Sequence, residues 1–223
     1  MCECFRDLLN QLRRVLGSNS NTSAAFLAMT DQFQFAEGSA GEVRQLRIAD
    51  ALVYFGSGRF EDERGFYEEV EQKASEEPTA LQTGYAISKR NVMRGLHCSP
   101  YGKIVVCQAG GMWDVLVDLR PTSRTFMAWD YVVLSPTRRS RVYVPPGVGH
   151  GYLALEDNTV TLYLKLGRYE KSREIEVNAL DKSLGIAWPP PLDGASDYIM
   201  SVKDRSNPLA ADVLRGLQNT SRL

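Results

Sequence analysis

The histidine at position 97 is one of only two histidines in this chain, and it lies in a short stretch rich in chemically useful side chains. The stretch RGLHCSPYGK also contains Arg94 and Lys103. Histidine changes its charge near neutral pH, so it can remove a proton and return it. Cationic groups inside a protein need an anionic partner. The pattern therefore predicts an acid–base pocket that binds an anion. Its further predicted members are Arg64, Tyr163 and Tyr169.

The second histidine, His150, lies in PPGVGHGY, which has the P-x-G-x-x-H form of a motif in cupin barrels. Cupin metal sites need several nitrogen and oxygen donors in a fixed geometry. This chain has two isolated histidines and no H-x-H, and its four cysteines form no CxxC. We therefore expect no metal and no other cofactor. The structural alternative for His97 is a satisfied core histidine, and for His150 it is a residue that braces the Pro-Gly turn.

Short β-rich runs separated by Gly and Pro turns would have to position these side chains. They begin near residue 46 and recur about every ten residues, with little helical pattern between them. This spacing predicts an all-β domain, and a jelly-roll barrel fits the number of runs. The predicted runs are LRIADALVYF, KIVVCQA, MWDVLVDLR, AWDYVVLS, RVYVPP, GYLALE and TVTLYLKLG.

Two regions outside these runs have a different pattern. Apolar residues at helical spacing in 3–16 predict a short amphipathic helix, followed by a polar linker. The stretch PLAADVLRGLQ predicts a short C-terminal helix. We therefore divide the chain into an N-terminal extension, 1–45, and a jelly-roll domain with a C-terminal tail, 46–223.

Composition excludes several classes of function. The chain has 223 residues, 43% of them hydrophobic, and a net charge of -1. A nearly neutral chain has no electrostatic basis for binding nucleic acid. It contains no apolar run of about 18 residues, and charged residues interrupt the N-terminal apolar positions, so we expect no membrane span and no secretory signal. A cytoplasmic protein with reduced cysteines is the expectation.

Seven stretches, taken in their order along the chain, resemble the dTDP-4-dehydrorhamnose 3,5-epimerase family. Together they extend over about residues 46–209. The stretches are DERGFYEE (62–69), NVMRGLH (91–97), GKIVVCQAGGMWDVLVDLRPTSRTFMAW (102–129), RVYVPPGVGHGYLAL (141–155), LYLKLGRY (162–169), LGIAWP (184–189) and SVKD (201–204). The resemblance implies a cupin-like jelly roll without metal, generally a homodimer that exchanges strands. It also implies inversion of C3 and C5 in a dTDP-linked 4-keto-6-deoxyhexose.

The resemblance also implies a role for each matching residue. His97 corresponds to the base that removes the protons beside the ketone, and Asp204 to the carboxylate that orients it. Lys103 corresponds to the group that stabilises the enolate oxygen, and Tyr163 to the donor of the returning proton. His150 corresponds to a second histidine of the active site.

Further positions correspond to substrate-binding residues of the family. They are Arg64 and Arg94 near the diphosphate, Glu69, Gln82 near the nucleobase, and Tyr169 beside the substrate. The family pattern is altered at Gly84 and Ala86, which replace an amide and a hydroxyl, and at Cys98, which replaces an aromatic residue.

These changes leave other functions open. One is a single-centre epimerase or a ketoisomerase on a related nucleotide sugar. Another is a sugar-nucleotide-binding barrel without turnover, against which the complete set of His97, Lys103, Tyr163 and Asp204 argues. A metal-dependent cupin oxygenase is the most distant alternative, and elemental analysis for bound metal would detect it.

Overall fold

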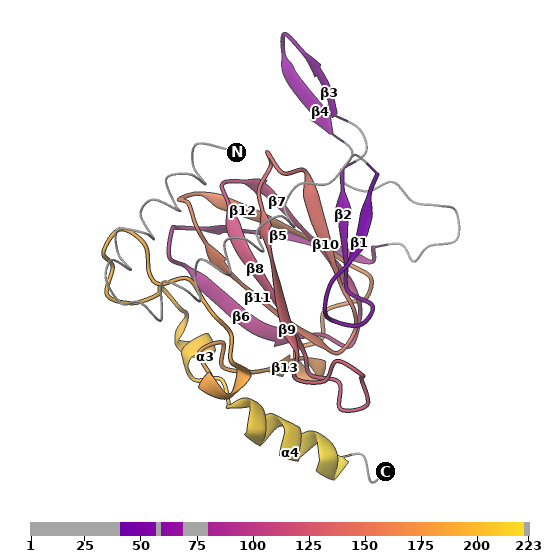
Figure 1. Cartoon of the computed structure of the whole chain (residues 1–223), viewed down its shortest axis with the longest axis vertical. Helices are drawn as coiled ribbons and strands as arrows, with labels where there is room; N and C mark the ends of the chain where they lie inside the picture. The colour runs from indigo at the N-terminus through magenta and orange to yellow at the C-terminus, as the bar shows by residue number, and fades with distance from the viewer. Residues whose placement is uncertain (1–40, 57–58, 69–79, 221–223) are drawn as a thin grey trace.

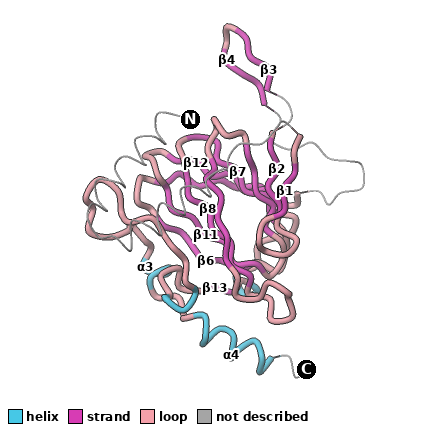
Figure 2. The backbone as a smooth tube through the Cα atoms, viewed as in Figure 1, coloured by secondary structure: helices cyan, strands magenta, loops and turns pink. Residues whose placement is uncertain are grey.

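The computed structural model describes residues 41–56, 59–68 and 80–220. The helix expected at 3–16 lies outside these residues. Antiparallel strands are the main regular secondary structure of the described chain, and its two α-helices lie at the C-terminal end (Figures 1 and 2). The all-β jelly roll and the short C-terminal helix predicted from the sequence are therefore confirmed.

Two antiparallel sheets form the barrel. Most strands that are neighbours in a sheet lie far apart in the sequence. The six-stranded sheet has the order β1-β2-β10-β7-β12-β5, and the five-stranded sheet has the order β13-β6-β11-β8-β9. The strands of the first sheet are β1 (Val43–Gln45), β2 (Leu52–Phe55), β10 (Ser140–Val144), β7 (Lys103–Ala109), β12 (Thr159–Lys165) and β5 (Gln82–Ser88). Those of the second are β13 (Ile175–Glu176), β6 (Met93–Cys98), β11 (Val148–Ala154), β8 (Met112–Asp118) and β9 (Trp129–Leu134).

A separate two-stranded hairpin, β3 (Arg59–Asp62) and β4 (Gly65–Glu68), projects from one end of the barrel (Figure 1). Neither this hairpin nor β5 was among the predicted strand runs. Gly84 and Ala86 interrupt the β-rich pattern of β5, and this strand forms an edge of its sheet. Pairing with β12 along its whole length makes it a strand despite that weak local preference.

The strands of the two sheets differ in how far their residues are buried. β7 and β10 alternate between buried and less buried residues, as expected for strands with one face toward the core. Every residue of β8 and β11 is buried. One apolar cluster fills the space between the sheets, and a second packs the other face of β8 and β11 against residues 177–213. The C-terminal segment therefore covers the five-stranded sheet.

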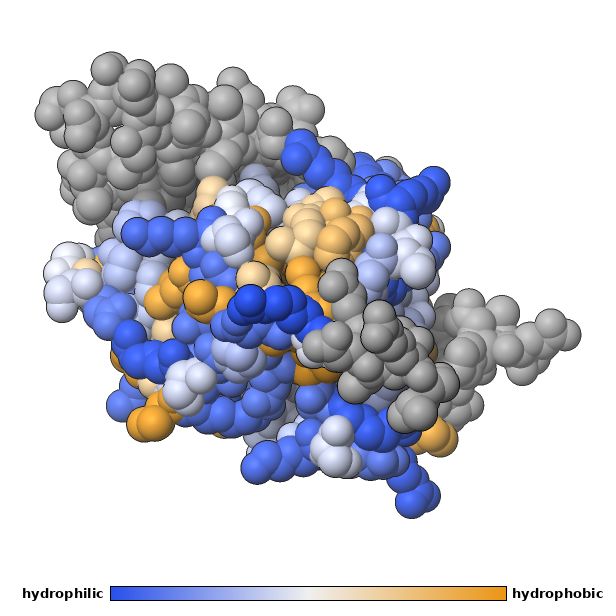
Figure 3. All heavy atoms as spheres, turned by 90° about the horizontal axis from the view of Figure 1, so that it is seen from below, coloured by the Kyte–Doolittle hydropathy of each residue, from blue (hydrophilic) through white to orange (hydrophobic). Residues whose placement is uncertain are grey.

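The helices of this segment are short. They are the 3-10 helices Lys171–Arg173 and Lys182–Leu184, α3 (Val202–Arg205) and α4 (Ala210–Thr220). Ser201 caps α3, because its hydroxyl accepts a hydrogen bond from the backbone N–H of Asp204. From below, the described surface is mainly hydrophilic, with smaller apolar patches (Figure 3).

Two glycines let β6 and β11 approach each other closely. A Cβ on Gly95 would lie 2.7 Å from the backbone of Gly151 and His150, and a Cβ on Gly151 would lie 2.6 Å from the carbonyl oxygen of Arg94. Gly95 also has φ +112°, which a residue with a side chain rarely adopts. The register shifts at this point and then places His97 opposite His150.

Gly151→Ala is expected to destabilise the protein by about 1–3 kcal/mol, because the added methyl group has no room between β6 and β11. Urea unfolding followed by circular dichroism would measure the change. Gly84→Ala is the matched control, since nothing lies within 4 Å of its added Cβ, and it should change stability by no more than about 0.5 kcal/mol. Equal stability of Gly151→Ala and the wild type would contradict the close approach.

Candidate active site

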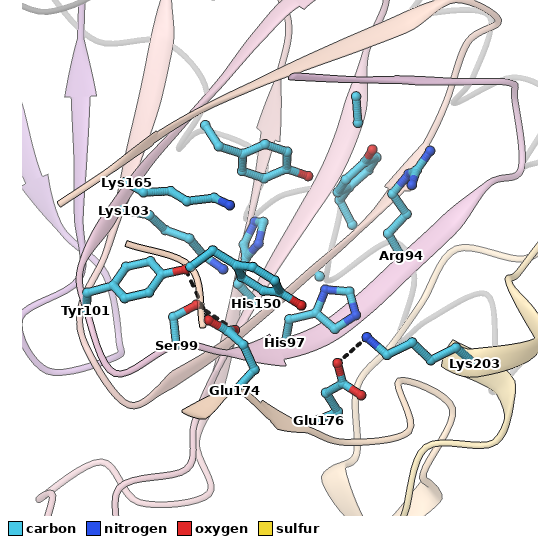
Figure 4. Close-up of a pocket in the computed structure, with 15 residues that line it drawn as sticks. Arg94, His97, Ser99, Tyr101, Lys103, His150, Lys165, Glu174, Glu176 and Lys203 are labelled. Carbon is cyan, nitrogen blue, oxygen red and sulfur yellow. Dashed lines mark hydrogen bonds and ion pairs between the residues drawn. The ribbon is translucent and has the colours of Figure 1, made fainter. Parts of the chain in front are cut away.

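A cavity of about 230 Å³ is lined by side chains from both sheets and from the C-terminal segment. His97 and Arg94 reach it from β6, His150 from β11, Lys103 from β7 and Tyr163 from β12. Figure 4 shows Arg94 across the cavity from Lys103 and Lys165. The fold thus brings together most of the site residues that were predicted from the sequence.

His97 is paired with a carboxylate from the far end of the chain. Its Nε2 lies 2.9 Å from Oδ1 of Asp204, 107 residues away. The His97 side chain is 36% exposed, whereas Asp204 is 8% exposed. Burial acts to raise the pKa of Asp204, but hydrogen bonds from His97 and its other neighbours hold that pKa below its usual value. A carboxylate that stays ionised can orient the imidazole and stabilise its protonated form.

A second histidine–aspartate pair lies deeper in the barrel. Nε2 of His150 is 2.7 Å from Oδ1 of Asp114, and both side chains are buried. Burial lowers the pKa of His150 despite the opposing effect of Asp114. A neutral His150 that donates from Nε2 to this carboxylate has an unprotonated Nδ1 as an acceptor. The sequence analysis missed Asp114, although an aspartate within the apolar run MWDVLVD was a usable signal.

Lys103 is 6% exposed, and burial lowers its pKa to about 8. The carboxylate of Glu174 opposes this effect and raises the Lys103 pKa. Two hydroxyl groups hold Glu174 in place: Ser99 donates to Oε2 at 2.8 Å and Tyr101 donates to Oε1 at 3.1 Å (Figure 4). Glu174 therefore acts as a fixed negative charge beside a buried ammonium group, and the sequence analysis did not identify it.

Lys165 is a further cation in the cavity that was not predicted from the sequence as a site residue. It is the register partner of Lys103 on the neighbouring strand, so both ammonium groups lie on the same side of the cavity (Figure 4). Its Nζ lies 4.9 Å from the ring centroid of Tyr169, close enough for a cation–π contact. Alternation along β12 was the available signal, because Tyr163 and Lys165 are two residues apart and share a face.

Two predicted binding residues lie near the mouth of the cavity. The backbone N–H of Tyr169 donates to Oε1 of Gln82 at 2.9 Å, and Tyr169 is 45% exposed. Gln82 does not line the cavity but supports a residue that does. On α3, Lys203 forms an ion pair with Glu176 at the same opening.

One predicted binding residue, Arg64, does not line this cavity within one chain. Arg64 lies in the turn of the projecting β3–β4 hairpin, 84% exposed and bonded to Asp62. Glu69 lies outside the described residues.

In 41–56, 59–68 and 80–220, no three His, Cys, Asp or Glu side chains are grouped so that they could hold a metal ion. No helix in these ranges is long and apolar enough to cross a membrane.

The cavity combines a histidine that is paired with an ionised carboxylate, an ammonium group and a phenol. Such a set of groups is suited to proton transfer at a carbon next to a carbonyl. The fold and the site thus define a barrel enzyme of the isomerase class. Residues 45–212 match the sequence model described as dTDP-4-dehydrorhamnose 3,5-epimerase. The chain belongs to this family.

Individual relatives agree with this assignment. The chain is 38% identical over 166 residues to dTDP-4-dehydrorhamnose 3,5-epimerase of Streptomyces griseus, covering 70% of this chain and 80% of the relative. The rmlC epimerase structure of Mycobacterium tuberculosis has a TM-score of 0.74 and 32% identity, covering 81% and 96% of the two chains. A 3'-monoepimerase of Streptomyces bikiniensis in complex with dTDP-quinovose has a TM-score of 0.70 and 29% identity, covering 80% and 98%.

Glu174→Gln is expected to move the pKa of Lys103 below about 8, because it removes the carboxylate that raises it. NMR titration of lysine-labelled protein would measure this pKa. The matched control is Glu176→Gln, which removes a carboxylate paired with Lys203 instead. A Lys103 pKa that responds equally to both changes would contradict a specific effect of Glu174.

Proposed function

We propose that this enzyme inverts C3 and C5 of dTDP-4-dehydro-6-deoxyglucose, giving dTDP-4-dehydrorhamnose. The observation that carries the proposal is the pairing of His97 with Asp204. His97 lines the same cavity as Lys103 and Tyr163. Hydrogens on the carbons beside a ketone are acidic because the resulting carbanion delocalises onto the oxygen as an enolate. Each inversion then needs a base on one face of the sugar and an acid on the other.

His97 acts as the base at each centre, and Asp204 stabilises the imidazolium that forms. Lys103 donates to the enolate oxygen, where its charge is strongest in a site that excludes water. Its pKa of about 8 lets the ammonium form predominate at neutral pH. Tyr163 returns a proton on the opposite face. His150, held neutral by burial, can accept a hydrogen bond from a sugar hydroxyl through Nδ1.

Substrate binding follows from the charge and position of the remaining residues. Arg94 supplies a guanidinium group at the cavity, suited to the diphosphate. Tyr169 packs beside the substrate and is held there by Gln82. Arg64 and Glu69 belong to the predicted nucleotide site, and in a strand-exchanged homodimer the hairpin of a partner subunit could supply Arg64. The reaction takes place in the cytoplasm without a cofactor.

The experiment that tests the reaction is incubation with dTDP-4-keto-6-deoxyglucose in deuterated water, followed by proton NMR. We expect exchange and inversion at both C3 and C5. His97→Asn should abolish both while nucleotide binding is retained, because the proton acceptor is lost but a polar side chain remains. Asp204→Asn should be strongly impaired.

The same experiment separates the other functions. If deuterium appears at C3 alone, the enzyme is a 3-epimerase. If neither carbon exchanges its proton although the nucleotide sugar binds, the protein is a binding barrel without turnover. Wild-type turnover in His97→Asn would refute the mechanism. In Tyr163→Phe, His97 should still remove a proton and return one on the same face, so that exchange continues with little inversion.

A homodimer is the expected assembly, and the edge strand β5 supports it. Tyr85 is 72% exposed and Ile87 is 57% exposed on this strand, which among the described residues pairs only with β12. The edge of a sheet readily pairs with another strand. Size-exclusion chromatography with light scattering should give about twice the 24.9 kDa of one chain. Tyr85→Lys and Ile87→Lys should shift the protein toward monomer. A wild-type monomer at micromolar concentration would exclude the dimer.

A further inference from the structure

Lys165 is a cation of the cavity to which no role has been given so far. Its side chain lines the cavity from β12, and its closest recorded neighbour is the ring of Tyr169, 4.9 Å from Nζ to the ring centroid. The other lysine near the opening, Lys203, is paired with the carboxylate of Glu176. Among the described residues, no carboxylate forms such a pair with Lys165.

The charges of the lysine, arginine and glutamate side chains that line the cavity do not balance. The cations are Arg94, Lys103, Lys165 and Lys203, and the carboxylates are Glu174 and Glu176. Glu176 neutralises Lys203, and the charge of Glu174 acts on Lys103. Arg94 donates to the uncharged oxygens of Ser88 and Ile87. Arg94 and Lys165 therefore leave two positive charges in the cavity, and such charges call for an anionic ligand.

The position of Lys165 indicates which part of a sugar nucleotide carries that anion. Lys103, its register partner on β7, is 6% exposed and lies deep in the cavity, whereas Tyr169 at the mouth is 45% exposed. The ammonium group of Lys165 lies beside both residues (Figure 4). A diphosphate joins the sugar to the nucleoside. With the sugar at His97 and Lys103 and the nucleoside toward the mouth, the diphosphate lies at the level of Lys165.

We propose that Lys165 binds the diphosphate of the nucleotide sugar, as the counterpart of Arg94 on the opposite side of the cavity. The two phosphoryl groups carry two negative charges, which match these two cations. Binding also has a consequence for Lys103, whose pKa is lowered by the like charge of Lys165. The diphosphate offsets that like charge, so substrate binding favours the ammonium form of Lys103. This inference rests on the proposed epimerase function.

The variant that tests it is Lys165→Met, which keeps the length of the side chain and removes its charge. We expect KM for dTDP-4-keto-6-deoxyglucose to rise about 10- to 100-fold, the effect of one hydrogen bond between charged groups. The change in kcat should stay below about threefold, because the contact is the same in the ground and transition states. Isothermal titration calorimetry should give a similar loss of affinity for dTDP, with a weaker dependence on salt than in the wild type.

Two further variants serve as controls. Lys165→Arg keeps the positive charge and should retain the affinity for dTDP within about fivefold. Lys182→Met removes the same charge from an exposed lysine outside the cavity, so KM and the affinity for dTDP should be those of the wild type. A purely structural role of Lys165 would not give this dependence on charge and position.

The outcomes separate this inference from the function on which it rests. If the wild type inverts and Lys165→Met keeps its KM and its affinity for dTDP, the inference is overturned and the function stands. A fall in kcat with unchanged KM, or an equal loss of affinity in Lys182→Met, would overturn it as well. If thermal melting shows that Lys165→Met does not fold, Lys165→Gln is measured against the same criteria.

The calorimetry does not depend on turnover. If the wild type binds dTDP but neither exchanges nor inverts, the proposed reaction is wrong, and a loss of dTDP affinity in Lys165→Met would still support the contact with the diphosphate. A wild type that does not bind dTDP would overturn both.

Discussion

The close contact between β6 and β11 is the constraint on which the site depends. Gly95 and Gly151 face each other across these strands with no space for a Cβ on either. Because the strands approach so closely, the register beyond the contact places His97 opposite His150. A side chain at either glycine would push the strands apart and displace both histidines. The same short backbone segments therefore determine packing and chemistry, which couples the stability of the barrel to its catalytic geometry.

Each histidine is then oriented by an aspartate in a different environment. Asp114 comes from the buried strand β8 and holds His150 in the interior, where burial keeps the ring neutral. Asp204 comes from α3 in the C-terminal segment and holds His97 at a partly open position. The segment that covers the five-stranded sheet thus also supplies the partner of the proposed base. A proton acceptor that exchanges with solvent has to remain accessible, and His97 is the more exposed of the two.

The hydroxyl groups around the cavity have two different physical tasks. Ser99 and Tyr101 donate to Glu174 and stabilise a negative charge near Lys103. Ser88 accepts a hydrogen bond from Arg94 and is itself hydrogen-bonded to Tyr152. The positive charge of Arg94 lowers the pKa of Tyr163, a phenol that burial makes less acidic. Both arrangements bring an opposite charge toward a buried titratable group. Desolvation is the main obstacle to acid–base chemistry in this barrel, and these side chains offset it.

The sequence by itself determined the jelly-roll class, the terminal helix and six of the fifteen residues that line the cavity, because strand alternation and short motifs are local patterns. His97, Lys103, His150 and Tyr163 were all predicted in this way. Only the tertiary structure decided that Asp114, Glu174, Lys165 and Tyr152 join them, and that Arg64 stays apart on its hairpin. These placements depend on strand order and register between segments far apart in the chain, which local periodicity does not encode.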